Sequence, residues 1–101
     1  MLSPDQYRTP EHLSLLEATK AIGIRATHIE YSDSPIYTNY EGLDDAVLIA
    51  IKELIDRKNP LILIRRYRHY NKIYVETYKV RDMVLPPDLR DYDPYKKYRA
   101  L

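Results

Sequence analysis

Residues 45–67 read DAVLIAIKELIDRKNPLILIRRY, and within them the apolar pattern changes from a helical to a strand period. Before Asn59-Pro60, apolar residues recur at three- and four-residue steps, which predicts an amphipathic helix. Its apolar face comprises Val47, Leu48, Ile51, Leu54 and Ile55, and its polar face comprises Lys52, Glu53, Asp56 and Arg57. Asp44 or Asp45 is expected to cap this helix, with Asp45 assigned as the N-cap, and the proline is expected to end it.

Beyond the proline, two short segments have the composition of strands. Residues 61–64, LILI, are long enough for a buried strand and too short for a buried helix. After a polar turn near residues 69–72, the β-branched Ile73, Val75 and Thr77 alternate with tyrosine and glutamate, which predicts a second strand with one drier face. We therefore expect a β-hairpin.

An earlier helix is expected to precede this unit. Ser14 and Glu17 match the S-x-x-E capping box, in which each side chain accepts a hydrogen bond from the other residue's backbone amide. The apolar stripe that follows, to about Tyr31, comprises Leu15, Ala18, Ile22, Ala26 and Ile29. Gly23 interrupts it at a cost of about 0.5–1 kcal/mol relative to alanine, which suggests a place where another backbone comes close. The segment ending in Pro35 stops the helix.

These elements predict a small α+β domain with two amphipathic helices followed by a β-hairpin. A flexible N-terminal arm is placed at residues 1–12, because that segment has two prolines and no periodicity. The domain is placed at residues 13–85. A flexible, basic and tyrosine-rich tail is placed at residues 86–101, which have no apolar period to offset the entropy of ordering.

Several classes of protein do not fit this composition. With no cysteine, the chain can form neither a disulfide framework nor a thiolate zinc site, and no metal or cofactor is expected. An enzyme is not expected either, because two glycines leave little room for a phosphate-binding loop and no nucleophile elbow is present. No apolar run approaches the roughly 18 residues of a membrane span and no leader opens the chain, so we expect an intracellular protein with no membrane partner.

Charge and tyrosine are unevenly distributed along the chain. Residues 1–60 carry six Lys and Arg against ten Asp and Glu, whereas residues 61–101 carry ten against five. The basic part could face an acidic partner or a phosphate backbone. An alternative function is therefore a small single-stranded nucleic-acid-binding module that uses the basic, tyrosine-rich stretches 65–70 and 95–99, although a net charge of +1 is low for that class.

Two series of residues, in a fixed order, carry a resemblance to a known family. The first helix contributes Ser14, Glu17, Ala18, Gly23, Arg25, Ala26, His28, Ile29 and Pro35. The second helix and the strand contribute Asp45, Ala46, Ile49, Ala50, Glu53, Leu54, Lys58, Pro60, Ile64, Arg65, Arg66 and Tyr67. Over roughly residues 9–78 the chain resembles the omega-like subunit of multisubunit DNA-dependent RNA polymerases, which is archaeal subunit K and the common sixth subunit of eukaryotic nuclear polymerases.

Some positions depart from the family pattern. Ala46 stands in place of the family's proline, His28 in place of its glutamine and Ser14 in place of its threonine, and one extra residue lies between Pro60 and Arg65. The long acidic N-terminal tail of the eukaryotic members is missing. These departures fit a divergent or viral member of the family.

The resemblance implies a non-catalytic role in transcription. Members of this family bind the C-terminal region of the largest subunit and support the assembly and stability of the polymerase, whose catalytic magnesium is held by that larger subunit. The expected partners are therefore the largest subunit and the rest of the complex, with DNA contacted only through the complex and no small-molecule ligand. The expected location is the nucleus or cytoplasm, or the virion for a viral member.

The resemblance also implies which residues form the subunit interface. They are Gly23, Arg25, Ala26, Ile29, Pro35, Arg65, Arg66 and Tyr67. Arg25 is expected to pair with a carboxylate of the largest subunit, the alternative being a solvated helix arginine. Since Arg65 and Arg66 point to opposite faces of a strand, at most one is expected to be a buried interface anchor. Ser14, Glu17 and Asp45 are expected to be helix caps.

Overall fold

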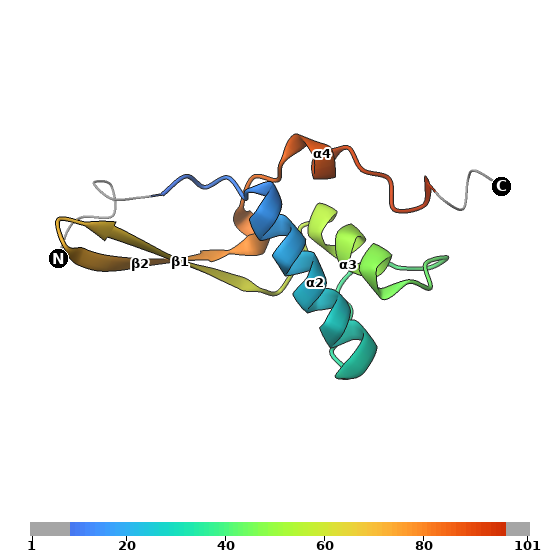
Figure 1. Ribbon diagram of the computed structural model, residues 1–101. Helices are drawn as coiled ribbons and strands as arrows, with labels where there is room; N and C mark the ends of the chain where they lie inside the picture. The colour runs from blue at the N-terminus through green and yellow to red at the C-terminus, as the bar shows by residue number, and fades with distance from the viewer. Residues whose placement is uncertain (1–8, 97–101) are drawn as a thin grey trace.

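The computed structural model describes residues 9–96 of the chain. Its elements are α2 (Leu15–Tyr31), α3 (Ala46–Ile55), β1 (Ile62–His69), β2 (Lys72–Lys79), the 3-10 turn η1 (Val80–Asp82) and the one-turn helix α4 (Pro87–Arg90). α2 and α3 pack together, and the hairpin of β1 and β2 projects away from them (Figure 1). The α+β class, with two main helices followed by an antiparallel hairpin, is as predicted.

Each main helix starts at a side-chain cap. Ser14 Oγ accepts from the backbone N–H of Glu17 at 3.1 Å, and the Glu17 carboxylate accepts from the backbone N–H of Ser14 at 3.1 Å. At the start of α3, Asp45 accepts from the backbone N–H of Val47 at 2.8 Å. Each cap of this kind contributes about 1 kcal/mol by pairing an amide that the helix leaves open.

The end of α3 is a left-handed turn that redirects the chain into the hairpin. Arg57 has a φ of 58°, and its N–H donates to the Leu54 carbonyl at 3.1 Å. The N–H of Lys58 donates to the Glu53 carbonyl at 3.0 Å, which completes a Schellman motif. The chain then turns at Asn59 and enters β1.

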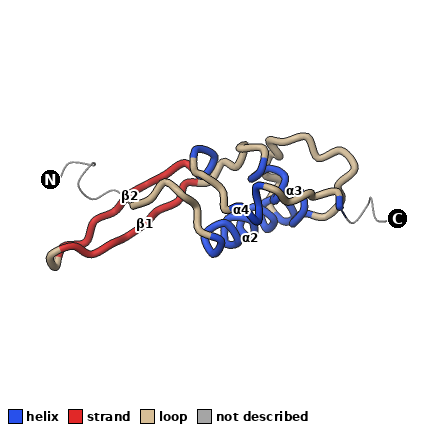
Figure 2. Tube along the Cα trace, turned by 90° about the horizontal axis from the view of Figure 1, so that it is seen from above, coloured by secondary structure: helices blue, strands red, loops and turns tan. Residues whose placement is uncertain are grey.

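β1 and β2 are longer than the two apolar runs that predicted them. They pair antiparallel, from Ile62 opposite Lys79 to His69 opposite Lys72. The connection is the dipeptide 70–71, whose two φ angles are 49° and 61°, as a two-residue turn with the twist of a hairpin requires. Figure 2 shows the hairpin extending well beyond the helices, with the chain from residue 9 running beside it.

The core lies where α2 and α3 meet the segments that flank the hairpin. Its most buried residues, each at most 2% exposed, are Leu13, Ala18, Ala50, Leu54, Val80 and Met83. A smaller cluster of Leu43, Leu48 and Ile49 packs against Tyr95. Residues 86–96 were expected to belong to a flexible tail, yet Leu89 is 8% exposed and joins the main core. Leu89 and Tyr95 are enough to hold this segment against the domain, because the helices already present apolar surface to them.

The predicted apolar stripes are partly wrong. Leu15 and Val47, expected on the buried faces, are 51% and 47% exposed. Arg25 and Glu53 take buried positions instead, with exposures of 1% and 0%. Periodicity treats every charge as a surface residue and therefore misses a charge pair that is buried between two helices.

Candidate subunit interface

Arg25 and Glu53 form a bidentate ion pair between α2 and α3. The distance from Arg25 Nε to Glu53 Oε1 is 2.5 Å, and that from Nη2 to Oε2 is 2.8 Å. The guanidinium also donates to Ser34 Oγ and to the Pro35 carbonyl, both at 3.0 Å, while the Tyr37 backbone N–H donates to Glu53 at 3.2 Å. The pair therefore holds the connector after α2 against both helices.

The expected partner of Arg25 was a carboxylate of another subunit, whereas the carboxylate that meets it is Glu53 of the same chain. The assignment of Glu53 to the polar face of its helix is wrong for the same reason. A sequence signal did exist, because Glu53 lies three residues after Ala50 and four after Ile49, both of which are buried. A carboxylate in that position shares the core-facing side of the helix and needs a cation there.

Arg65 makes a second bidentate pair, with the capping residue Glu17. The distance from Arg65 Nε to Glu17 Oε2 is 2.9 Å, and that from Nη2 to Oε1 is 2.8 Å. The same guanidinium donates to Thr9 Oγ1 at 3.0 Å, to the His12 carbonyl at 2.8 Å and to the Pro10 carbonyl. Arg65 thus joins three segments, namely the chain before α2, the first turn of α2 and β1.

Glu76, opposite Arg65 on β2, holds the same N-terminal segment. Its carboxylate accepts from the Thr9 backbone N–H at 2.9 and 3.1 Å, from Thr9 Oγ1 at 2.6 Å and from Tyr78 Oη at 2.5 Å. Further along this face, the rings of Tyr67 and Tyr74 stack with centroids 5.5 Å apart. Residues 9–12, expected as a free arm, therefore cover one face of the hairpin.

The lowered pKa values of Glu17 and Glu76 predict that the folded protein loses stability in acid. The hydrogen bond from Arg65 lowers the pKa of Glu17 from 4.5 to about 2. Burial raises the pKa of Glu76, but hydrogen bonds from Thr9 and Tyr78 outweigh it, and this pKa also falls to about 2. Since both folded-state values lie below the ordinary value, the unfolded chain takes up these protons first as the pH falls. The stabilisation should be complete above about pH 4.5 and disappear as the pH approaches about 2.

Urea unfolding between about pH 6 and pH 2.5 measures this effect. The free energy of unfolding should fall less steeply with acid in the Glu17→Gln variant than in the unmodified chain. Glu30→Gln, which removes an exposed carboxylate elsewhere on α2, is the matched control and should keep the original slope. If both variants had the same slope, the Glu17 ion pair would not be the source of the acid sensitivity.

The other face of the hairpin is exposed and rich in β-branched residues. Ile62, Ile64, Ile73 and Val75 are 56–65% exposed on it. Arg66 lies on the same face, opposite Val75, and no ion pair involving Arg66 is found among the described residues. The expectation of a buried first strand is therefore wrong at Ile62 and Ile64. The tyrosine and glutamate side chains form the drier face instead, because the N-terminal segment supplies their hydrogen-bond partners.

The residues expected at the interface divide into three groups. Arg25, Ala26 and Ile29 lie in or against the core, with Pro35 exposed beside them and its carbonyl bound to Arg25. Arg65 and Tyr67 lie on the covered face of the hairpin, whereas Arg66 points outward. Gly23 is exposed on α2, with open space around the position that a Cβ would occupy. The closely approaching backbone that Gly23 suggested does not come from the described part of this chain.

The alternative function relied on tyrosines of the C-terminal part. Tyr95 packs against the cluster around Leu43, and its hydroxyl donates to the Glu41 carbonyl at 2.9 Å, so most of its ring does not offer a free stacking surface. Residues 97–99, which completed the basic stretch, lie outside the described residues. Tyr70, at the tip of the hairpin, is 86% exposed.

Residues 9–96 contain neither a metal-binding cluster nor a helix that could span a membrane. Within that range, no cluster of three or more His, Asp or Glu side chains is arranged to hold a metal ion. None of the helices in that range has both the length and the apolar composition needed to cross a membrane.

Comparison with known proteins identifies two similar sequences. The "DNA-directed RNA polymerases I, II, and III subunit RPABC2" of Saccharomyces cerevisiae is 38% identical over 63 residues, which are 62% of this chain and 39% of the yeast protein. The protein of the same name from Schizosaccharomyces pombe is 38% identical over 63 residues, covering 62% of this chain and 42% of that protein. The match thus spans about two fifths of the length of these relatives. No protein-family model matches the chain.

Proposed function

We propose that this chain, a distant homologue of the polymerase subunit RPABC2, is a non-catalytic subunit of a DNA-directed RNA polymerase that binds the largest subunit and supports assembly of the enzyme. The observation that carries the proposal is the 38% identity over 63 residues. A segment of that length is long enough to contain both main helices, or one of them together with the hairpin. Catalysis is assigned to the larger subunits of the complex.

The exposed face of the hairpin supports a contact with a larger protein. An isolated two-stranded hairpin is marginally stable in water, and this one leaves Ile62, Ile64, Ile73 and Val75 largely exposed. Each aliphatic side chain that becomes fully buried on binding contributes about 1.5–3 kcal/mol, before the entropic cost of association. A partner that covers this face would stabilise both the hairpin and the complex.

Within this proposal the expected interface residues have different roles. Arg66 is the side chain best placed for a direct contact, because it is surrounded by exposed aliphatic groups and is free of intramolecular ion pairs in the described chain. Arg65 supports the same strand from its opposite face, through the ion pair with Glu17. Arg25 fixes the connector that presents Pro35, and Gly23 offers a flat part of α2 as a second contact.

Co-purification with the polymerase tests the proposal. An affinity-tagged chain should recover the largest subunit from its native cells, and Arg66→Glu should lower that recovery by about tenfold or more, as expected when a central charged anchor of an interface is reversed. Arg90→Glu, an equal charge reversal on the exposed side of α4, is the matched control and should leave the recovery unchanged. Thermal unfolding should show that both variants remain folded.

Recovery of no polymerase subunit by the unmodified chain would refute the function itself. Equal recovery with Arg66→Glu would refute the hairpin face as the contact while leaving the subunit role in place. Single-stranded DNA that binds the isolated chain with a steep dependence on salt would favour the nucleic-acid module instead.

A further inference from the structure

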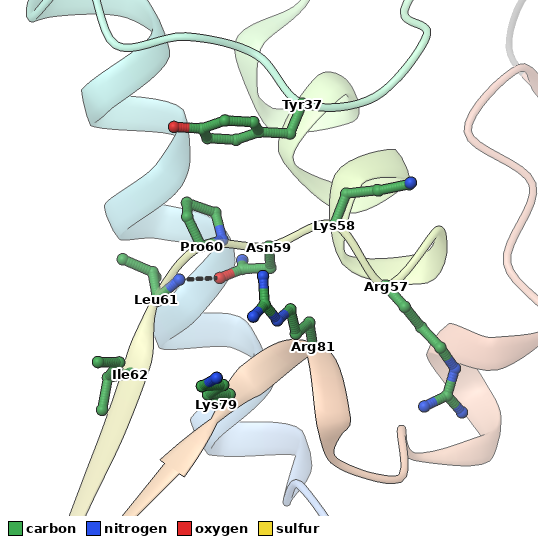
Figure 3. A pocket seen from close by; sticks show the side chains of 9 residues that line it. All are labelled: Tyr37, Arg57, Lys58, Asn59, Pro60, Leu61, Ile62, Lys79 and Arg81. Atoms are coloured by element: carbon green, nitrogen blue, oxygen red, sulfur yellow. Dashed lines mark hydrogen bonds between the residues drawn. The ribbon is translucent and has the colours of Figure 1, made fainter.

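A pocket of about 540 Å³ lies where the turn after α3 meets the base of the hairpin (Figure 3). It is lined by Tyr37, Arg57, Lys58, Asn59, Pro60, Leu61, Ile62, Lys79 and Arg81. The connector after α2 contributes Tyr37, and the Schellman turn at the end of α3 contributes Arg57 and Lys58. The paired ends of β1 and β2 contribute Ile62 and Lys79, and η1 contributes Arg81. Residues far apart in the sequence are therefore brought together here by the fold.

The pocket lining is rich in basic residues, one of which, Arg57, already donates to the Met83 carbonyl at 3.3 Å. Four of its nine lining residues are Lys or Arg, and none is Asp or Glu. The side chains of Lys79 and Arg81 have no ion pair or hydrogen bond to any residue in the described range. Two acidic residues are direct sequence neighbours of lining residues. Asp56 is already bound by Lys52 at 2.6 Å and by the hydroxyl of Thr38, and Asp82, next to Arg81, is exposed and is not part of the lining. No acidic side chain of the described range therefore lines the pocket.

Asn59 gives an independent sign that an acceptor is missing. This side chain is 1% exposed, and its Oδ1 accepts from the backbone N–H of Leu61 at 2.8 Å. Its Nδ2 is buried and has no hydrogen-bond partner. Buried donors are almost always paired in folded proteins, so an orphan donor calls for an explanation. Arg81 and Asn59 line the same pocket, and in the view of Figure 3 the Arg81 side chain extends toward Asn59.

We propose that this pocket binds a carboxylate from an acidic segment of a protein partner. A carboxylate can accept from a guanidinium and an amide at the same time. A protein segment is favoured over a nucleic acid because aliphatic side chains of Pro60, Leu61 and Ile62 form part of the walls. Ile62 and Lys79 pair across the hairpin, and Ile62 also belongs to the exposed aliphatic face, so one partner chain can cover the face and enter the pocket.

Binding can be measured without a polymerase. The full chain, labelled with ¹⁵N, is titrated with an N-acetylated octaglutamate peptide while the Asn59 side-chain amide and the backbone amides of Lys58, Asn59 and Leu61 are followed by NMR. These signals should shift in a saturable way. Arg81→Gln should weaken the binding about tenfold, the loss of one charge-assisted hydrogen bond. Arg68→Gln, which removes the same charge from the far end of β1, should change it by less than about twofold.

A second variant tests the orphan donor directly. Asn59→Asp keeps an oxygen for the Leu61 amide and places a second oxygen where the unpaired donor was. The new carboxylate would then pair with Arg81 in place of a carboxylate from a partner. Binding of the peptide should then be lost. Equal weakening by Arg81→Gln and Arg68→Gln, or tighter binding of an oligothymidylate to the same residues at the same salt, would overturn the proposal in favour of a diffuse charge effect or a phosphate site.

This inference rests on the proposed function only for the location of the partner. Peptide binding in a chain that recovers no polymerase would refute the proposed function and support the pocket. A chain that recovers polymerase but shows no shift with the peptide would refute the pocket and leave the proposed function standing.

Discussion

Glu53→Gln is expected to lower the free energy of unfolding by about 3–5 kcal/mol, because it leaves Arg25 as a buried cation without its counter-charge. Both side chains are at most 1% exposed, and two short hydrogen bonds join them. Water cannot replace the lost carboxylate at such a depth. Since domains of this size have a total stability of about 5–15 kcal/mol, the variant should be marginally folded at best.

Urea unfolding at neutral pH measures this change, and the chain contains its own control. Lys52 and Asp56 form an ion pair of 2.6 Å on the outer side of the same helix, with side-chain exposures of 20% and 33%. Asp56→Asn should cost less than about 1 kcal/mol, since water can solvate the remaining lysine. A Glu53→Gln variant as mild as Asp56→Asn would contradict the structural role of the buried pair.

A double replacement separates loss of the charge from loss of packing. Arg25→Met combined with Glu53→Leu removes both charges and fills similar volume, so it should be considerably more stable than Glu53→Gln alone. The double variant lacks the guanidinium that donates to Ser34 and Pro35, so the connector after α2 should exchange its amide hydrogens faster.

The second large effect is expected for Arg65→Ala, which should lower the free energy of unfolding by about 2–3 kcal/mol. This change removes the bidentate bond to Glu17 and the bonds to Thr9, Pro10 and His12. Hydrogen bonds to charged groups contribute about 1.5–3 kcal/mol each at most, and the partly exposed Glu17 can recover water in the variant. The loss is therefore smaller than for the fully buried pair.

Arg66→Ala is the matched control, because it is the same substitution one residue later on the opposite face of β1. It should change stability by less than about 0.5 kcal/mol. Hydrogen exchange gives a second readout, since the Leu13 amide is bonded to the Val84 carbonyl at 2.8 Å and should lose protection only when Arg65 is removed. Equal effects of the two substitutions would show that Arg65 does not anchor the N-terminal segment.

Local sequence patterns predicted most of the fold. The capping box at Ser14, the alternation of residues 73–78 and the proline at 60 depend on contacts within a few residues, so they can be recognised before any tertiary structure is known. The candidate interface was predicted less well. For the two adjacent arginines on β1, the pattern indicated that they face opposite sides. It did not indicate which of them would form an ion pair within the chain.

The chain's own order of residues determines two capped helices, a stop at Asn59-Pro60 and two strands, because each of these is set by backbone geometry and short-range hydrogen bonds. Tertiary packing decides that Glu53 meets Arg25, that residues 9–12 cover the tyrosine face of the hairpin and that Asn59 and Arg81 share a pocket. These partners are up to 69 residues apart in sequence. Whether a charge is buried or exposed depends on which distant group comes to meet it, and no local period contains that information.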